Sequence, residues 1–212
     1  MLVGDYDCNQ DLLMAKVILI HKDKDIAILD HYTPIALLNT IYHLIKVIIT
    51  SRLSRLSEKY AVMEGSQYGF RAHCGVQLVV QWAHWVQQQA MKDSGTLIRI
   101  DLDFKSAFNS AGHSCLWVIL RGLGVLDVDF LEDLHSNSWM KIQVGSDCTA
   151  PIQLDTGTVQ GSVLSPILFD LFLNALLRLL DATGITHGIR RTPQWNHAAF
   201  ADDDDCFYYF QK

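Results

Sequence analysis

The first half of the chain changes from an alternating to a helical pattern of hydrophobic and polar positions. An apolar run at 16–21 is followed by the polar residues 22–25, which predicts a strand, a turn and a second short strand at 26–29. After Pro34, apolar residues recur every three or four positions from Leu38 to Leu56, the pattern of an amphipathic helix. Residues 76–91 predict another helix of this kind.

The second half contains more strands. Along 97–104, Ile98, Ile100 and Leu102 alternate with Arg99, Asp101 and Asp103, as expected for a strand. A long helix is expected at 165–182, with Ser165 as its N-cap and Pro166 at its first position. Short helices are expected at 116–121 and 130–134, a hairpin from 141–144 and 152–154, and two strands, 197–201 and 206–210, around four aspartates. Because strands and helices come in mixed order without a βαβ repeat, the pattern predicts an α+β fold with an antiparallel sheet and helices on one face.

Composition narrows the classes of protein. The 212 residues carry a formal net charge of −6, which is unusual for a nucleic-acid-binding surface. Five scattered cysteines without a CxxC pair indicate reduced thiols in an intracellular protein rather than a zinc site. The apolar helix at 167–180 has a polar stripe of Asp170, Asn174 and Arg178, so we expect a buried helix with one solvated or paired edge and no membrane span.

Carboxylates are the main chemical feature. The run at 202–205 lies between apolar segments that must pack, and Asp103 ends an apolar strand. Two carboxylates about 4 Å apart at a surface repel by roughly 4 kcal/mol, and a divalent cation reverses that effect. If the strands are neighbours, these groups form a Mg²⁺ site suited to phosphoryl transfer. The alternatives are a solvated acidic loop and a strand-terminal Asp103 that caps a turn.

At these residues the chain resembles the reverse transcriptases of non-LTR retrotransposons. Residues 103–110, DFKSAFNS, resemble the first palm motif, and 200–203, FADD, resemble the aromatic-x-Asp-Asp box. Residues 160–169, QGSVLSPILF, are similar to the Gln-Gly motif that leads into a palm helix. Residues 34–39 and 67–71, PIALLN and QYGFR, resemble fingers motifs. Five motifs in the family order cover about 16–210.

The resemblance implies a role for each matching residue. Asp103, Asp202 and Asp203 would be catalytic and would hold two Mg²⁺ or Mn²⁺ ions. The residues that would contact the incoming nucleotide or the template are Phe108, Gln160, Gly161, Lys22 and Arg71. Their alternative roles are core packing for Phe108, an ordinary turn for 160–161, and solvated surface charges for Lys22 and Arg71.

The resemblance also implies an architecture and partners. The fold would be that of a right-hand polymerase, with fingers-like residues 1–95 and palm-like residues 96–212, an antiparallel palm sheet backed by helices, and no thumb. The partners would be an RNA template, a DNA primer and dNTPs, without a membrane. A basic helix face with Lys46, Arg52 and Arg55 is a candidate for nucleic-acid contact, which would offset the acidic composition.

Departures from the family pattern keep a second hypothesis open. Thr33 stands where an Arg that contacts the triphosphate is usual, and Thr cannot replace a bidentate cation. Asp204 and Asp205 add charges that would hinder strand pairing or shift the turn. Together with the missing thumb, they predict weak or no polymerase activity for these residues alone. The alternative is a decayed or truncated retrotransposon fragment with a palm-like fold, at most binding nucleic acid.

Two further enzyme classes are considered. A metal-dependent nuclease that uses the same aspartates is a minor alternative. A serine hydrolase is excluded because the sequence has no G-x-S-x-G elbow.

Overall fold

The computed structural model describes residues 10–22, 25–92, 96–104, 107–154, 156–182, 197–201 and 203–210. Two compact units divide the chain, and each combines two separate segments. The first unit comprises Met1–Ser51 and Phe108–Ser165, and the second comprises Arg52–Ala107 and Pro166–Lys212. The predicted division into fingers 1–95 and palm 96–212 concerns the family's subdomains and stays a prediction.

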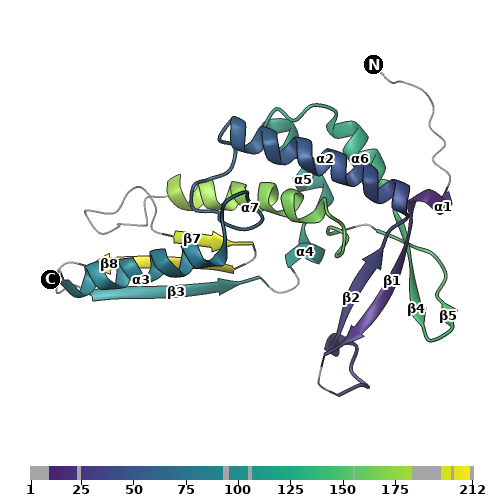
Figure 1. The fold of residues 1–212 in the computed structure, drawn as a ribbon, viewed down its shortest axis with the longest axis horizontal. Helices are drawn as coiled ribbons and strands as arrows, with labels where there is room; N and C mark the ends of the chain where they lie inside the picture. The colour runs from purple at the N-terminus through teal and green to yellow at the C-terminus, as the bar shows by residue number, and fades with distance from the viewer. Residues whose placement is uncertain are drawn as a thin grey trace. The chain divides into compact units, whose positions relative to one another are not determined.

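The first unit contains a mixed sheet around the strand β1, Met14–His21 (Figure 1). Strand β1 pairs antiparallel with β2, Tyr32–Leu37, and parallel with β4, Trp139–Val144. Strand β4 pairs in turn with two short strands, β5, Asp147–Cys148, and β6, Ile152–Gln153. The predicted hairpin of 141–144 with 152–154 is only partly correct: the two strands pair, but through Trp139 and Met140, whereas Gln143 and Val144 pair with β5.

The second strand of this sheet differs from the prediction. Residues 26–29 do not form a strand; a turn and the 3₁₀ helix η1, Leu29–His31, occupy this part of the chain. The strand that pairs with β1 is β2, which contains Pro34. Because β2 is the edge strand of the sheet, Pro34 has no second neighbouring strand that requires its missing N–H.

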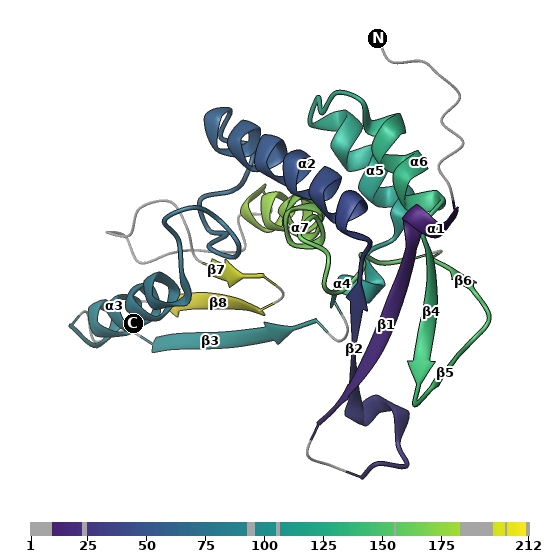
Figure 2. The same cartoon turned by 45° about the vertical axis from the view of Figure 1, so that its right-hand side comes forward.

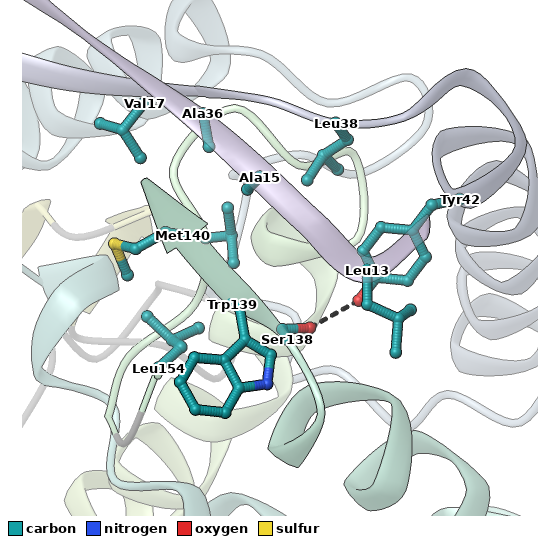
Figure 3. Close-up of a pocket in the computed structure, with 11 residues that line it drawn as sticks. Leu13, Ala15, Val17, Ala36, Leu38, Tyr42, Ser138, Trp139, Met140 and Leu154 are labelled. Atoms are coloured by element: carbon teal, nitrogen blue, oxygen red, sulfur yellow. Dashed lines mark hydrogen bonds between the residues drawn. The ribbon is translucent and has the colours of Figure 1, made fainter. Parts of the chain in front are cut away.

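Helices α1, Gln10–Leu13, α5, His113–Gly122, and α6, Val128–Ser136, complete the first unit together with the beginning of α2, Thr40–Lys59. Leu13, Tyr42 and Leu134 form a cluster that joins α1, α2 and α6. Figure 3 shows a small cavity beside it, with mainly apolar side chains and the hydrogen-bonded hydroxyls of Tyr42 and Ser138 on its wall. Its volume of about 20 Å³ has room for about one water molecule and is far too small for a nucleotide.

The second unit contains a three-stranded antiparallel sheet in the order β3-β8-β7, which spans Thr96–Asp103, Asp203–Phe210 and His197–Phe200 (Figure 2). Helix α3, Val76–Lys92, lies along this sheet, and its buried Val86 and Ala90 pack with Leu97 of β3. The predicted helix at 76–91 and strand at 97–104 are confirmed. A short helix, α4, Ala107–Ser110, follows β3 after two residues that the structure does not describe.

Helix α7, Ser165–Ala182, has the predicted polar stripe. Asp170 and Asn174 are buried, and Asn174 accepts a hydrogen bond from the backbone of Glu64 and donates one to Val62. Arg178 forms an ion pair with Glu64 at 3.0 Å. The expected paired edge is thus confirmed for Asn174 and Arg178, whereas the carboxyl of Asp170 has no hydrogen-bond partner among the described residues. None of the helices in the described ranges is long and apolar enough to cross a membrane.

The buried face of helix α2 agrees only in part with the predicted one. Of the predicted apolar positions, Leu53 is buried and Ile45 and Ile49 are half-buried, whereas Ile41, Ile48 and Leu56 are exposed. The buried positions are Tyr42, Lys46, Leu53 and Ser57. Apolar residues surround this helix on every side, so periodicity alone does not distinguish the buried face.

Candidate active site

The aspartates predicted to be catalytic lie on adjacent strands of the second unit. Strands β3 and β8 place Asp103 opposite Asp203 and Asp101 opposite Asp205. Residues directly opposed in an antiparallel pair have Cβ atoms about 4.5–5.5 Å apart. The predicted adjacency of the strand that ends at Asp103 and the strand after the aspartate turn is therefore confirmed at the level of the backbone.

The turn between β7 and β8 is tighter than the four-aspartate run suggested. Phe200 pairs with Asp203, so only Ala201 and Asp202 connect the two strands. Ala201 is buried and has a φ of 58°, in the left-handed region that two-residue hairpin turns use. Asp202 lies outside the described residues.

Asp204 and Asp205 are part of β8 rather than of the turn. Their backbones pair with Leu102 and Asp101 of β3 on one side and with Ala199 and Ala198 of β7 on the other. The expectation that these extra charges hinder strand pairing is wrong, because the backbone of both residues is paired with two neighbouring strands.

The residues at this sheet are chemically compatible with a bound cation. Asp101 forms an ion pair with Arg99 at 2.5 Å, and Asp103 is exposed. Like charges directly opposite each other on paired strands destabilise a sheet, and a divalent cation relieves that repulsion. Carboxylate oxygens also suit Mg²⁺ chemically, so the residues present fit such an ion.

The ligand set itself stays a prediction. Among the described side chains, no group of three His, Cys, Asp or Glu residues lies close enough to hold a metal. The side chains of Asp202 and Asp203 are not among those described.

A loop at 66–69 is hydrogen-bonded to the edge of β7 that faces away from β8. The backbone of Ala199 donates to Ser66 O and accepts from Tyr68 N, both at 2.8 Å, and Gln67 and Ala199 form a parallel β-bridge. Gln67 is fully buried, and its side-chain oxygen accepts hydrogen bonds from Gly69 N at 2.8 Å and Ala201 N at 3.3 Å. Its amide nitrogen donates to Ala201 O at 3.5 Å.

Gly69 is required by the close approach of this loop to the turn. A Cβ at position 69 would lie 2.3 Å from Ala201 N and 2.9 Å from Ala201 Cα. The motif QYGFR was noted in the sequence as a fingers motif, but neither contact with Ala201 was foreseen. The signal available in the sequence is a glutamine and a glycine two residues apart, Gln67 and Gly69, within that motif.

Arg71, the last residue of that motif, is engaged within the second unit. Its Nε and Nη2 donate to the two oxygens of Glu58 at 2.8 and 2.9 Å, and its Nη1 donates to the carbonyls of Glu64 and Gln67. The hydrogen bonds to Glu58 raise the pKa of Arg71, and those same bonds lower the pKa of Glu58. Arg71 is therefore not a simple solvated charge; its contact with a nucleotide stays a prediction.

In the first unit, three of the predicted nucleotide-binding residues lie close together. Thr158 N donates to Phe108 O at 2.6 Å, and Ala36 N of β2 donates to Gln160 O at 2.9 Å. Gly161 has a φ of 101°, and a Cβ there would lie 2.7 Å from Ala36 O, so only glycine fits.

His113, which the sequence gave no reason to select, also fixes this loop. Its Nε2 lies 2.6 Å from the carbonyl of Gly157 and donates to it in the tautomer that carries the proton there. The backbone N–H of the same Gly157 donates to Ala111 O. The segment 157–161 is thereby held at both ends.

Lys22 lies just after β1, where its backbone N–H donates to His31 O at 2.8 Å across the β1–β2 hairpin. Its side chain is exposed, which suits contact with a phosphate and a solvated surface charge equally.

Lys46 is not the surface cation that was predicted. It is fully buried, and its Nζ lies 4.2 Å from the centre of the Tyr42 ring. Burial lowers the pKa of Lys46 to about 8. The proposal that Lys46 faces nucleic acid is wrong for that reason, whereas Arg52 and Arg55 on the same helix are exposed.

Asp170 of α7 is the corresponding buried acid in the second unit. Neither carboxyl oxygen has a hydrogen-bond partner among the described residues. Burial raises the pKa of Asp170 to about 8, although the positive charge of Arg71 opposes the shift. At neutral pH this carboxyl is mostly protonated, which makes it a poor metal ligand.

Comparison with known proteins identifies the class. Residues 20–208 match the family model described as reverse transcriptase (RNA-dependent DNA polymerase). The fold agrees: a telomerase structure from Candida tropicalis, truncated from its C-terminal domain, superposes with a TM-score of 0.65 at 11% identity over 95% of this chain and 44% of that one. The chain therefore belongs to the reverse transcriptase family, and the predicted α+β fold of fingers and palm is confirmed.

Curated relatives indicate the branch of that family. The Pol polyprotein of a type-1 R2 retrotransposable element from Popillia japonica is 30% identical over 129 residues, 59% of this chain and 21% of the relative. A probable RNA-directed DNA polymerase from transposon BS of Drosophila melanogaster is 29% identical over 167 residues, 75% of this chain and 18% of the relative. The chain thus spans about a fifth of these relatives, and the resemblance to non-LTR reverse transcriptases is confirmed.

Proposed function

We propose that this domain catalyses RNA-directed transfer of a nucleotide from a dNTP to the 3′-hydroxyl of a DNA primer. The observation that carries the proposal is the register that sets Asp103 opposite Asp203, one residue after the β7–β8 turn, in a chain of the reverse transcriptase family. Reverse transcriptases as a family depend on divalent metal ions, and this pair of positions supplies carboxylates for them.

Asp103, Asp202 and Asp203 would hold two Mg²⁺ or Mn²⁺ ions. Ions bound there would favour deprotonation of the primer hydroxyl and neutralise the leaving pyrophosphate. The role of the chain is to keep the carboxylates close together despite their repulsion, which two hydrogen-bonded strands and a two-residue turn can do.

The nucleotide, primer and RNA template would be positioned by other residues. Phe108, Gln160 and Gly161 are the candidates of the first unit, because the 157–161 loop is fixed by hydrogen bonds to Phe108 and Ala36. Lys22 would contact phosphate from the loop end of the β1–β2 hairpin. Arg71 would contact a triphosphate through the remaining N–H of Nη2, and a bidentate contact through Nε and Nη2 would compete with its ion pair to Glu58.

Binding of Mn²⁺ to the 212-residue chain, followed by electron paramagnetic resonance, tests the metal site. Asp103→Asn and Asp203→Asn are each expected to weaken Mn²⁺ binding about tenfold, because each removes a charged ligand. The control is Asp147→Asn in β5, an exposed aspartate of the other unit, which should leave the affinity unchanged. Equal affinity in all four proteins would disprove the site.

Incorporation of a single dNTP on an RNA template with a DNA primer tests catalysis, and it is measured on a longer protein in which a thumb domain follows this domain, because these 212 residues alone are expected to have weak or no activity. Thr33→Arg is expected to raise incorporation, because it restores a bidentate phosphate donor, and Asp103→Asn combined with it should abolish the gain. Mn²⁺ binding without incorporation in any variant would favour the second candidate, a palm-like fragment that binds nucleic acid without catalysis. The observation behind that candidate is Thr33 itself.

A further inference from the structure

We infer that Gln67 is a positioning residue that holds the β7–β8 turn in the conformation that presents the catalytic aspartates. This inference rests on the proposed function for its catalytic meaning. Its structural content is that one buried amide bonds to both backbone polar groups of Ala201, the residue that immediately precedes Asp202.

The turn needs such support because of its backbone. Ala201 has a left-handed φ of 58° without being glycine, and it is buried. An alanine avoids this conformation, and its N–H and carbonyl would have no water available in a buried turn. Gln67 supplies the missing partners, with its oxygen for the N–H at 3.3 Å and its amide nitrogen for the carbonyl at 3.5 Å.

Gln67 can hold the turn because its own backbone is fixed. The bridge to Ala199 and the hydrogen bonds at Ser66 and Tyr68 attach its loop to the edge of β7 that lies opposite β8. Arg71 Nη1 donates to the carbonyl of Gln67 at 2.9 Å, and the same guanidinium is bound to Glu58. β7 is thus flanked by β8 on one side and by this braced loop on the other.

The functional consequence follows from the geometry of metal sites. Ligands of a catalytic ion must be held within about 0.5 Å of their working positions. Asp202 and Asp203 directly follow Ala201, so a rotation of the Ala201 backbone would displace both. If Gln67 only filled space in the core, the loss of its polar atoms would not displace Asp202 and Asp203.

The test uses Gln67→Met, which keeps the length of the side chain and removes its polar atoms. The matched control is Asn174→Leu. Asn174 is another buried amide of the second unit, but it bonds to Val62 and Glu64 and not to the turn. Both variants lose buried hydrogen bonds, so both should lower the melting temperature.

Two measurements separate positioning from general stability. Hydrogen exchange of the Ala201 amide, followed by NMR on protein labelled with ¹⁵N-alanine, should become about tenfold faster in Gln67→Met and stay within twofold in Asn174→Leu. Mn²⁺ affinity should fall about tenfold in Gln67→Met and stay within twofold in Asn174→Leu. The variant Gln67→Glu, which keeps an accepting oxygen, should lie between wild type and Gln67→Met in both measurements.

Each outcome bears on one proposal or on both. Unchanged exchange at Ala201, or an equal effect of Asn174→Leu, overturns the role of Gln67 and leaves the metal site intact. Faster exchange with an unchanged Mn²⁺ affinity overturns the positioning role as well. A wild-type chain that binds no Mn²⁺ overturns the proposed function, and with it the catalytic meaning of Gln67, while exchange at Ala201 still reports whether the amide holds the turn.

Discussion

The loop at 157–161 in the first unit and the loop at 66–69 in the second are both attached to a strand beside a glycine. In the first, Ala36 of β2 donates to Gln160 O, and Gly161 lies against Ala36. In the second, Ala199 of β7 is bonded to Ser66 and Tyr68, and Gly69 lies against Ala201.

The two loops differ in where the unusual backbone conformation lies. In the first unit the positive φ belongs to Gly161 itself, which adopts it without steric cost. In the second unit it belongs to Ala201, for which the left-handed region costs roughly 1–2 kcal/mol. Only there does a buried side-chain amide, that of Gln67, complete the attachment. The comparison teaches that glycine lets Gly161 adopt its conformation without a side-chain partner of its own, whereas the non-glycine Ala201 is held by Gln67 at both of its backbone polar groups.

The largest effect is expected from Gly69→Ala. Its Cβ would overlap backbone atoms of Ala201, which cannot move as a flexible side chain would, so we expect a loss of about 3 kcal/mol in the free energy of unfolding. Urea denaturation measures the change. The control is Gly122→Ala at the end of α5, where no atom lies within 4 Å of the new Cβ, and which should be neutral or slightly stabilising.

Gly161→Ala should cost somewhat less, about 2 kcal/mol. Its φ of 101° strains any residue with a Cβ, and the new atom would lie 2.7 Å from Ala36 O. Gly124→Ala isolates the strain alone, because Gly124 also has a positive φ but open space around it. If both variants lose the same stability by urea denaturation, close contact with Ala36 is not what selects glycine at position 161.

The comparison extends to one buried ionisable group in each unit, and Asp170→Asn should have the next effect. The folded pKa of about 8 lies above the ordinary value of 3.8, so wild-type stability is fully present below pH 4 and is lost as pH rises toward 8. The variant should therefore match wild type near pH 4 and exceed it by on the order of 2 kcal/mol at pH 7. Urea unfolding at several pH values measures this difference. A constant difference across that range would show that Asp170 does not titrate as described.

Lys46→Met should give the smallest change, about 1 kcal/mol of added stability at pH 7. The folded pKa of about 8 lies below the ordinary 10.5, so the cost of burying the charged amine is greatest below pH 8 and disappears as pH rises toward 10.5. Contact of the ammonium with the Tyr42 ring offsets part of that cost, which keeps the gain small. Urea unfolding from pH 7 to 10.5 measures it. A loss of stability at pH 7 would show that the charged lysine is a net stabilising group.

The individual elements of the second unit could be predicted from sequence because their signals are local. The alternation along 97–104 predicted β3, but the adjacency of β3 and the aspartate strand was only a condition of the predicted metal site, and the register of Asp103 with Asp203 now meets it. The first unit was harder. Strand β1 has its parallel partner β4 more than a hundred residues later, and no local pattern reports such pairing.

Other differences have equally physical causes. Helix α2 is apolar on all sides, so its buried face depends on its neighbours, and a buried Lys46 was assigned to the surface. The contacts of Gln67 and Gly69 with Ala201 depend on a backbone approach that only coordinates show. The QYGFR motif could single out Gln67 and Gly69 in the sequence, but it could not show that they contact Ala201.

The interleaving of the two units determines when each can form during synthesis on the ribosome. Strand β1 gains β4 only after residue 139 has been made, and β3 waits about as long for β8. Contacts this distant along a chain form slowly, and unpaired strand edges are exposed in the meantime. A nascent chain of this domain therefore carries both half-built sheets at once, and an expression host with chaperones that shield such edges should yield more folded protein.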